Sequence, residues 1–264
     1  MKSVHWATGI AASLLLSTSL FAQQPMLTAD QILDKYVQAV GGAQQFSGIK
    51  TWSEKWEVTG DLTEVYPAGR SPTPFKSHGT GGFYFKAPNL RVEWVQSDQK
   101  QFTAALGCDG KNSWTYSPLL GMRKQKPTAD HRYVCREGMG PLLPLKQSDA
   151  LLGSMILSRG KARLALKGQK EVAGRATFVI RAELPDQPGW DLYVDSENYL
   201  LVRVELLSRW THPNTIFSDY RDVAGIKVPF HIETHNDYGD KDIKVHEVQV
   251  NVPIDDQVFR KPNW

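Results

Sequence analysis

The chain has 264 residues, of which 41% are hydrophobic and 22% charged, as in an ordinary globular protein. Its formal net charge is only +3 and its Lys and Arg residues are scattered, so it lacks the basic block with which proteins follow a nucleic-acid backbone. A chain of this length can bury a large core without metal ions or many disulfides, and we expect no nucleic acid, cofactor or metal among its ligands.

The N-terminus carries the pattern of a secretory signal peptide. Lys2 precedes a charge-free run over residues 6–22, which is rich in small residues and ends at Ala22. The alternative is an uncleaved membrane anchor, but the run is barely long enough to span a bilayer and contains Ser and Thr. We therefore expect residues 1–22 to be a signal peptide and residues 23–264 to form a single domain in the periplasm.

The first element of the mature chain is predicted to be a helix. Thr28 and Gln31 have the spacing of a capping box, in which two side chains satisfy free N–H groups of the first turn. Apolar residues then recur at helical spacing from Ile32 to Val40, and the Gly-Gly pair at 41–42 is typical of a helix end. The predicted helix has one apolar stripe, so it must pack against another element.

Strand patterns dominate the rest of the first half. Trp52, Trp56 and Val58 alternate with polar residues, and Glu54 interrupts this apolar side. The stretch 61–77 is rich in Pro, Gly and Ser and predicts a long loop. Three further β-rich runs follow, at 81–88, 90–96 and 101–106.

The second half continues this pattern after a predicted amphipathic helix at 147–158. Strands are predicted at 176–184, at 190–195 and 199–207, which form a hairpin, at 226–235 and at 243–250. In all, about eleven strands with short links predict one large antiparallel sheet, and a sheet of that size tends to curl. The absence of an alternating βαβ pattern argues against Rossmann and TIM-barrel folds.

The chain has only two cysteines, Cys108 and Cys135. In an oxidising compartment a single pair is expected to form a disulfide, which would stabilise the fold by about 3–4 kcal/mol in the chain-entropy picture. The alternative is two free buried thiols. The pair has no matching CxxC motif or histidine pair, so it does not form a zinc site.

No sequence motif predicts catalysis. The chain lacks a G-x-S-x-G elbow, a P-loop, a dinucleotide fingerprint and an HExxH motif. His231 and His235 share one face of a predicted strand and His246 lies on a later one, so a three-histidine metal site is conceivable. We favour a solvated polar face, because Lys227 and Glu233 share it. We expect a protein that is not an enzyme, with a hydrolase of unfamiliar type as the alternative.

Aromatic residues concentrate on the first predicted strands. Alternate positions of a strand share one face, and two helices cannot cover one face of so large a sheet. Ordinary core packing accounts for part of this aromatic content, but the uncovered apolar surface is expected to form a hollow for an apolar ligand. The residues expected to line this hollow are Trp52, Trp56, Phe83, Phe85, Val92, Trp94, Phe178 and Ile180.

Several stretches of the sequence carry a family resemblance. The N-terminal stretch ADQILDKYVQAVGGAQQFSGIKT resembles the start of bacterial outer-membrane lipoprotein-sorting proteins, the LolA/LolB-like group. SDYRDVAGIKVPFHIE followed by NVPIDDQVF is similar to the end of these proteins, and WDLYVDSENYLLVRVEL to their central hairpin. The resemblance spans nearly the whole mature chain and concerns patterns of fold more than of chemistry.

The resemblance implies a curved antiparallel sheet, an incomplete β-barrel, with helices packed in its concave side. In the sorting family this hollow holds the acyl chains of a lipoprotein. The expected partners are therefore lipoprotein acyl chains or other lipids, with envelope membrane proteins as a further class, and the expected state is a monomer. The alternative is an envelope sensor or protein-interaction module on the same fold.

Overall fold

The computed structural model describes ten stretches of the chain: 27–64, 73–86, 89–96, 102–109, 113–117, 121–123, 163–183, 189–207, 214–236 and 239–260. The expected signal peptide at 1–22, the expected helix at 147–158 and the pairing of Cys108 with Cys135 lie outside the described residues and stay predictions.

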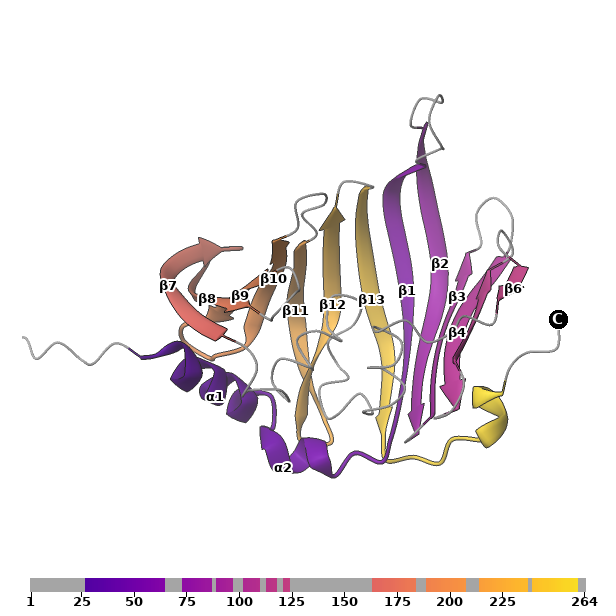
Figure 1. Cartoon of the computed structure of the whole chain (residues 1–264), viewed down its shortest axis with the longest axis horizontal. Helices are drawn as coiled ribbons and strands as arrows, with labels where there is room; N and C mark the ends of the chain where they lie inside the picture. The colour runs from indigo at the N-terminus through magenta and orange to yellow at the C-terminus, as the bar shows by residue number, and fades with distance from the viewer. Residues whose placement is uncertain are drawn as a thin grey trace, which may run out of the picture.

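A single antiparallel sheet organises the described residues (Figure 1). It contains thirteen strands in the order β6-β5-β4-β3-β2-β1-β13-β12-β11-β10-β9-β8-β7. The first strand, β1 (Thr51–Glu64), pairs with the last, β13 (Gly239–Val250), at the centre. The strands β6 (Gly121–Arg123) and β7 (Arg163–Val172) form the two open edges, so the sheet does not close into a barrel. This confirms the predicted fold class.

The other strands are β2 (Thr73–Lys86), β3 (Asn89–Gln96), β4 (Phe102–Asp109), β5 (Ser113–Ser117), β8 (Arg175–Glu183), β9 (Gly189–Asp195), β10 (Leu201–Leu207), β11 (Asn214–Val223) and β12 (Ile226–Asn236). The prediction of a loop over 61–77 is wrong for residues 61–64 and 73–77, because β1 and β2 stay paired as far as Glu64 and Thr73, while residues 65–72 lie outside the described residues. Backbone hydrogen bonds hold this end of the hairpin, where the side chains no longer show an apolar alternation.

The helix α1 (Ala29–Ala39) begins as its sequence predicts. The N–H of Gln31 donates to Thr28 Oγ1 at 3.2 Å and the N–H of Thr28 donates to Gln31 Oε1 at 2.9 Å, which completes the capping box. Such a cap stabilises a helix by about 1 kcal/mol. The Gly-Gly stop is confirmed, and a second short helix, α2 (Gly42–Ser47), follows directly, which the sequence pattern did not predict.

One face of the sheet, called the inner face here, packs with α1 into the main hydrophobic core. From α1 it takes Ile32, Leu33 and Tyr36, each at most 2% exposed. On β12 the predicted alternation is confirmed. The strand buries Ile226, Val228, Phe230 and Ile232 in this core, while Lys227, His231, Glu233 and His235 stay half-exposed. A smaller cluster of Val172, Val179, Tyr193 and Val202 lies on the opposite, outer face.

The C-terminal part of the described chain ends in a 3-10 helix, η1 (Asp256–Phe259). The carboxylate of Asp255 caps it by accepting a hydrogen bond from the N–H of Gln257 at 2.9 Å. Phe259 is buried, and Lys86 of β2 forms an ion pair with Asp256 at 2.6 Å. These contacts attach the chain end to the sheet beside β2, β3 and β4.

Candidate functional site

Four of the expected lining residues lie side by side on the inner face. Trp52 and Trp56 come from β1, and Phe83 and Phe85 come from β2. The register places Trp52 opposite Phe85, and all four side chains are 7% exposed or less and belong to the main core. These four residues are called the aromatic group below.

Gly81 makes the packing of Trp56 possible. The register places Gly81 opposite Trp56, and a Cβ at position 81 would lie 2.3 Å from the indole ring. Because no carbon atoms approach so closely, the indole can keep this position beside β2 only when residue 81 is a glycine. The glycine therefore shapes the aromatic surface as directly as the aromatic residues do.

The other expected lining residues are placed apart from this group. Ile180 is fully buried in the same core, but on β8, six strands away from β1 in the sheet order. Phe178 packs at the margin of the core and stacks on Tyr199 with ring centroids 6.3 Å apart. The structure therefore divides the predicted lining set between two regions of the inner face.

Val92 and Trp94 are placed by backbone register alone. In β3, position 92 lies opposite Phe83 and position 94 opposite Gly81. Both positions extend the rows of the aromatic group across the next strand. Their side chains lie outside the described residues, so their part in the lining stays a prediction.

The described helices do not pack over the aromatic group. The helix α1 contacts β7 and α2 contacts β12. Figure 1 shows both helices over the half of the sheet that runs from β7 to β12, and no helix of the described stretches crosses β1 or β2. The aromatic group is nevertheless buried, at 7% exposure or less, so in this structure it is a packed apolar surface and not an open hollow.

A buried carboxylate interrupts the aromatic group, as the sequence pattern indicated. Glu54 is 2% exposed and lies on the inner side of β1, between Trp52 and Trp56. The indole Nε1 of Trp52 donates to Glu54 Oε2 at 3.5 Å, and Glu54 takes part in further interactions within the chain. A buried charge needs such partners, because its transfer from water to an apolar interior is costly.

A row of polar residues at one end of the inner face was not predicted from the sequence. This polar row consists of Ser77, Gly60, Lys241, Thr234 and Thr215, which are successive register partners on β2, β1, β13, β12 and β11. It was missed because Gly60 and Ser77 border the predicted loop and Lys241 precedes the predicted start of the last strand. The signal is the alternation of β13 itself, because Lys241 stands two residues before the buried Ile243.

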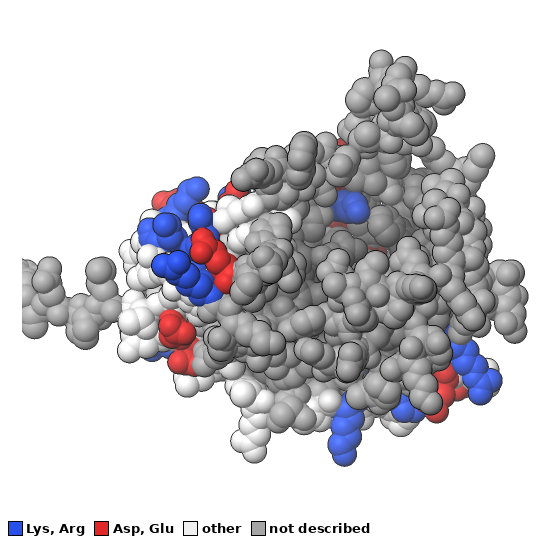
Figure 2. Space-filling view, viewed as in Figure 1, with Lys and Arg blue, Asp and Glu red and all other residues white. Residues whose placement is uncertain are grey.

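Figure 2 shows the charged residues on one side of the molecule. Acidic and basic side chains gather at the end where β7 and α1 lie, and a few more of both kinds are visible near the upper ends of β1 and β13. Charges of both signs are therefore present on this side of the molecule.

The three histidines of the conceivable metal site lie on the outer face and are paired with carboxylates. His231 contacts Asp242 at 2.8 Å, His235 contacts Asp240 at 2.9 Å, and His246 contacts Glu57 at 3.3 Å. Among the described residues no group of three or more His, Cys, Asp or Glu could hold a metal ion.

The outer face also carries a polar pocket of about 660 Å³ at the ends of β1, β2, β12 and β13. Most of its lining residues are outward ones, such as Glu233 and His235, but Gly60, Ser77 and Lys241 of the polar row line it as well. Its charged side chains are already paired, as Lys76 contacts Asp61 at 2.8 Å. We assign no ligand to it.

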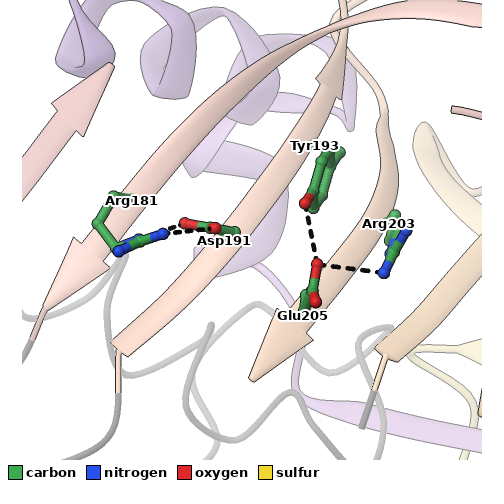
Figure 3. Close-up of polar contacts among 5 residues, drawn as sticks. All are labelled: Arg181, Asp191, Tyr193, Arg203 and Glu205. Carbon is green, nitrogen blue, oxygen red and sulfur yellow. Dashed lines mark hydrogen bonds and ion pairs between the residues drawn. The ribbon is translucent and has the colours of Figure 1, made fainter. Parts of the chain in front are cut away.

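A second set of polar contacts stabilises the outer face of β8, β9 and β10 (Figure 3). Arg181 Nη2 donates to Asp191 Oδ2 at 2.8 Å, and the Tyr193 hydroxyl donates to Glu205 Oε2 at 2.9 Å. Burial, together with this hydrogen bond, raises the pKa of Tyr193 to about 12. Arg203 donates to the same carboxylate at 3.1 Å. Each of these residues has a partner, either on a neighbouring strand or on the same strand, so we interpret this network as structural.

Within the described stretches, no helix has both the length and the apolar character needed to span a membrane.

Two solved structures share this architecture. A LolA superfamily protein from Nitrosomonas europaea aligns with a TM-score of 0.51 and 12% sequence identity, over 89% of this chain and 99% of that chain. A domain from Vibrio parahaemolyticus, assigned to outer-membrane lipoprotein sorting, aligns with a TM-score of 0.54 and 10% identity, over 88% of this chain and 97% of that one. No protein-family model and no curated protein matches the sequence. The chain has a LolA-like fold, as the sequence resemblance implied.

Proposed function

Starting from a fold shared with a lipoprotein-sorting domain, we propose that this chain is a periplasmic binding protein or carrier. It holds the acyl chains of lipids or lipoproteins against the inner face of its sheet, and it does so without catalysis. The observation that carries the proposal is the aromatic group of Trp52, Trp56, Phe83 and Phe85, an apolar surface on β1 and β2 away from both described helices.

The physical basis is the transfer of methylene groups out of water. Each buried CH₂ contributes about 0.8 kcal/mol, so an acyl chain of ordinary length needs a long apolar surface. The aromatic group offers flat, rigid rings that lose little conformational freedom on binding. Because these rings are already buried, an acyl chain would replace contacts that they make now, and its net affinity is the difference between the two sets of contacts.

A photoreactive fatty acid tests the proposal. We expect the protein, purified without detergent, to bind a fatty acid carrying a diazirine near its methyl end, and to retain it in native mass spectrometry. After irradiation, cross-links are expected on β1 and β2 at inner positions such as Trp52, Trp56, Phe83 and Phe85. The neighbouring outward residues Lys55 and Tyr84 are internal controls, because they belong to the same strands but the opposite face.

Two results would contradict the proposal. Cross-links confined to outward positions would show surface adsorption instead of binding at the inner face. A clean apo mass without uptake of added fatty acid would favour the sensor or protein-interaction module, in which the fold presents a surface to another protein.

A further inference from the structure

The polar row crosses the sheet in one line. Gly60 of β1 is the register partner of both Ser77 and Lys241, Lys241 is opposite Thr234, and Thr234 is opposite Thr215. Five strands thus contribute one residue each at the same level of the sheet. Such a line forms when the inward positions of adjacent strands are in register.

The polar row lies directly beside apolar inner-face residues. The next inward positions are Val58 on β1, Ile243 on β13, Ile232 on β12 and Phe217 on β11, which are register partners in the same order. All four are buried in the main core. The inner face therefore changes from apolar to polar within a single step along its strands, which is the arrangement that an amphiphilic ligand requires.

The polar row contains hydrogen-bonding groups held away from water. Ser77 is 4% exposed, and its hydroxyl has no hydrogen-bond partner among the described residues. Lys241 is half-buried, and this burial lowers the pKa of its amine. Lys241 and Thr215 also take part in other interactions within the chain. An unsatisfied buried hydroxyl and a desolvated ammonium both gain when an anion approaches.

The acidic neighbours of Lys241 in the sequence are directed elsewhere. Asp240 and Asp242 lie on the outer side of β13, where they contact His235 at 2.9 Å and His231 at 2.8 Å. Lys241 is therefore the charged residue that this end of β13 directs toward the inner face.

We propose that the polar row binds the anionic head of an acyl amphiphile. The ammonium group of Lys241 and the hydroxyl groups of Ser77 and Thr234 donate hydrogen bonds to phosphate or carboxylate oxygens, while the acyl chain runs along Val58 and Ile243 toward the aromatic group. This inference rests on the proposed acyl-binding function and adds the ligand class, an anionic rather than a neutral lipid.

A pair of ligands with the same acyl chain tests the inference. The wild-type protein is titrated at pH 7 with 1-myristoyl-glycerol 3-phosphate and with 1-myristoyl-glycerol, which differ only in the phosphate. We expect the phosphorylated ligand to bind roughly tenfold more tightly, since charge-assisted hydrogen bonds are the strong ones. Lys241→Gln is expected to remove this preference while leaving the affinity for the neutral ligand within about twofold.

Two further variants separate the role of the head-group site from general damage to the fold. Lys244→Gln changes an exposed lysine on the outer side of the same strand and should leave both affinities unchanged. Ser77→Ala removes a buried hydroxyl that lacks a partner among the described residues, so it should not reduce the unfolding midpoint, yet it should weaken the phosphorylated ligand about threefold to tenfold.

The possible outcomes are distinct. Equal binding of both ligands by the wild-type protein would overturn the head-group site and leave the acyl-binding function intact. Binding of neither ligand would overturn the proposed function and this inference with it. Millimolar inorganic phosphate should fail to displace the phosphorylated ligand. Displacement by phosphate alone would identify a site for a free anion and overturn the assignment to an amphiphile.

Discussion

Gly81 and Trp56 show how closely two single residues can depend on each other. A methyl group at position 81 would meet the Cε2, Nε1 and Cζ2 atoms of Trp56 at 2.3, 2.4 and 2.5 Å. Gly81→Ala must therefore displace an indole that is only 7% exposed, and overpacking of this kind costs about 1–3 kcal/mol. We expect a lower urea midpoint for the variant, measured by circular dichroism.

Gly189→Ala is the matched control for this prediction. Gly189 also lies in a strand, but its nearest neighbours to a new Cβ are at 3.4 Å or more, in ordinary van der Waals contact. Gly189 is the first residue of β9, so alanine should gain at most the advantage of about 0.5–1 kcal/mol that it has over glycine in a strand interior, and this variant should keep or slightly raise the midpoint. Equal losses in both variants would show that the indole contact is not what matters at position 81.

At the residue scale the sequence predicted the aromatic side chains but not the groups around them. Trp52 and Trp56 were identifiable because alternate positions of a strand share a face. The requirement for glycine at position 81 could not be identified, because it is imposed by Trp56, which lies 25 positions away in the sequence and pairs with position 81 across the β1–β2 ladder. Ser77 and Lys241 were missed because their strands were predicted to be shorter than they are.

At the scale of elements, α1 is attached to the sheet through its C-terminal end. The N–H of Lys227 donates to the carbonyl oxygen of Val40 at 3.0 Å, beyond the last helical residue. Gly41 has a φ of 128°, and a Cβ there would lie 2.5 Å from the carbonyl oxygen of Gly225. The helix end therefore lies against the turn between β11 and β12, and glycine allows both the backbone angle and the approach.

Gly41→Ala is expected to destabilise this attachment. The added methyl group combines left-handed backbone strain with a clash against a backbone oxygen, for a total of about 2–4 kcal/mol. Gly42→Ala is the control, because Gly42 also has a positive φ of 82°, but a Cβ there would meet no described atom within 4 Å. It should lose only about 1–2 kcal/mol in thermal or urea unfolding. Equal losses would show that the contact with Gly225 contributes nothing.

The elements were predictable to the extent that their signals are local. The capping box and the Gly-Gly pair gave both ends of α1, and the alternation in β12 gave its buried face. The far end of the β1–β2 hairpin was predicted as a loop, since its Pro- and Gly-containing sequence resembles one. Nothing in a local pattern indicates that the first strand pairs with the last, because that contact joins residues about 190 positions apart.

At the scale of the whole molecule, the β1–β13 pairing joins two runs of consecutive strands into one sheet. Strands β1 to β6 extend the sheet to one side and β13 to β7 extend it to the other. On the outer face, Lys55 and Glu247 form an ion pair across this junction at 2.8 Å. Glu57 contacts His78 of β2 at 2.8 Å and His246 of β13 at 3.3 Å, so a single carboxylate connects both sides of the junction.

Glu57 makes the stability of this junction dependent on pH. The hydrogen bond with His78, and then that with His246, lowers the pKa of Glu57 below its usual value of 4.5. The folded protein therefore binds fewer protons at this site than the unfolded chain, and the stabilisation is complete above pH 4.5 and lost as the pH falls through the lowered pKa.

Glu57→Gln should reduce the urea midpoint at pH 6, and the difference from the wild type should shrink by pH 3. Glu171→Gln on the exposed edge strand β7 is the control and should show no such convergence. A difference that stays constant between the two pH values would mean that the lost contribution of Glu57 is steric and not ionic.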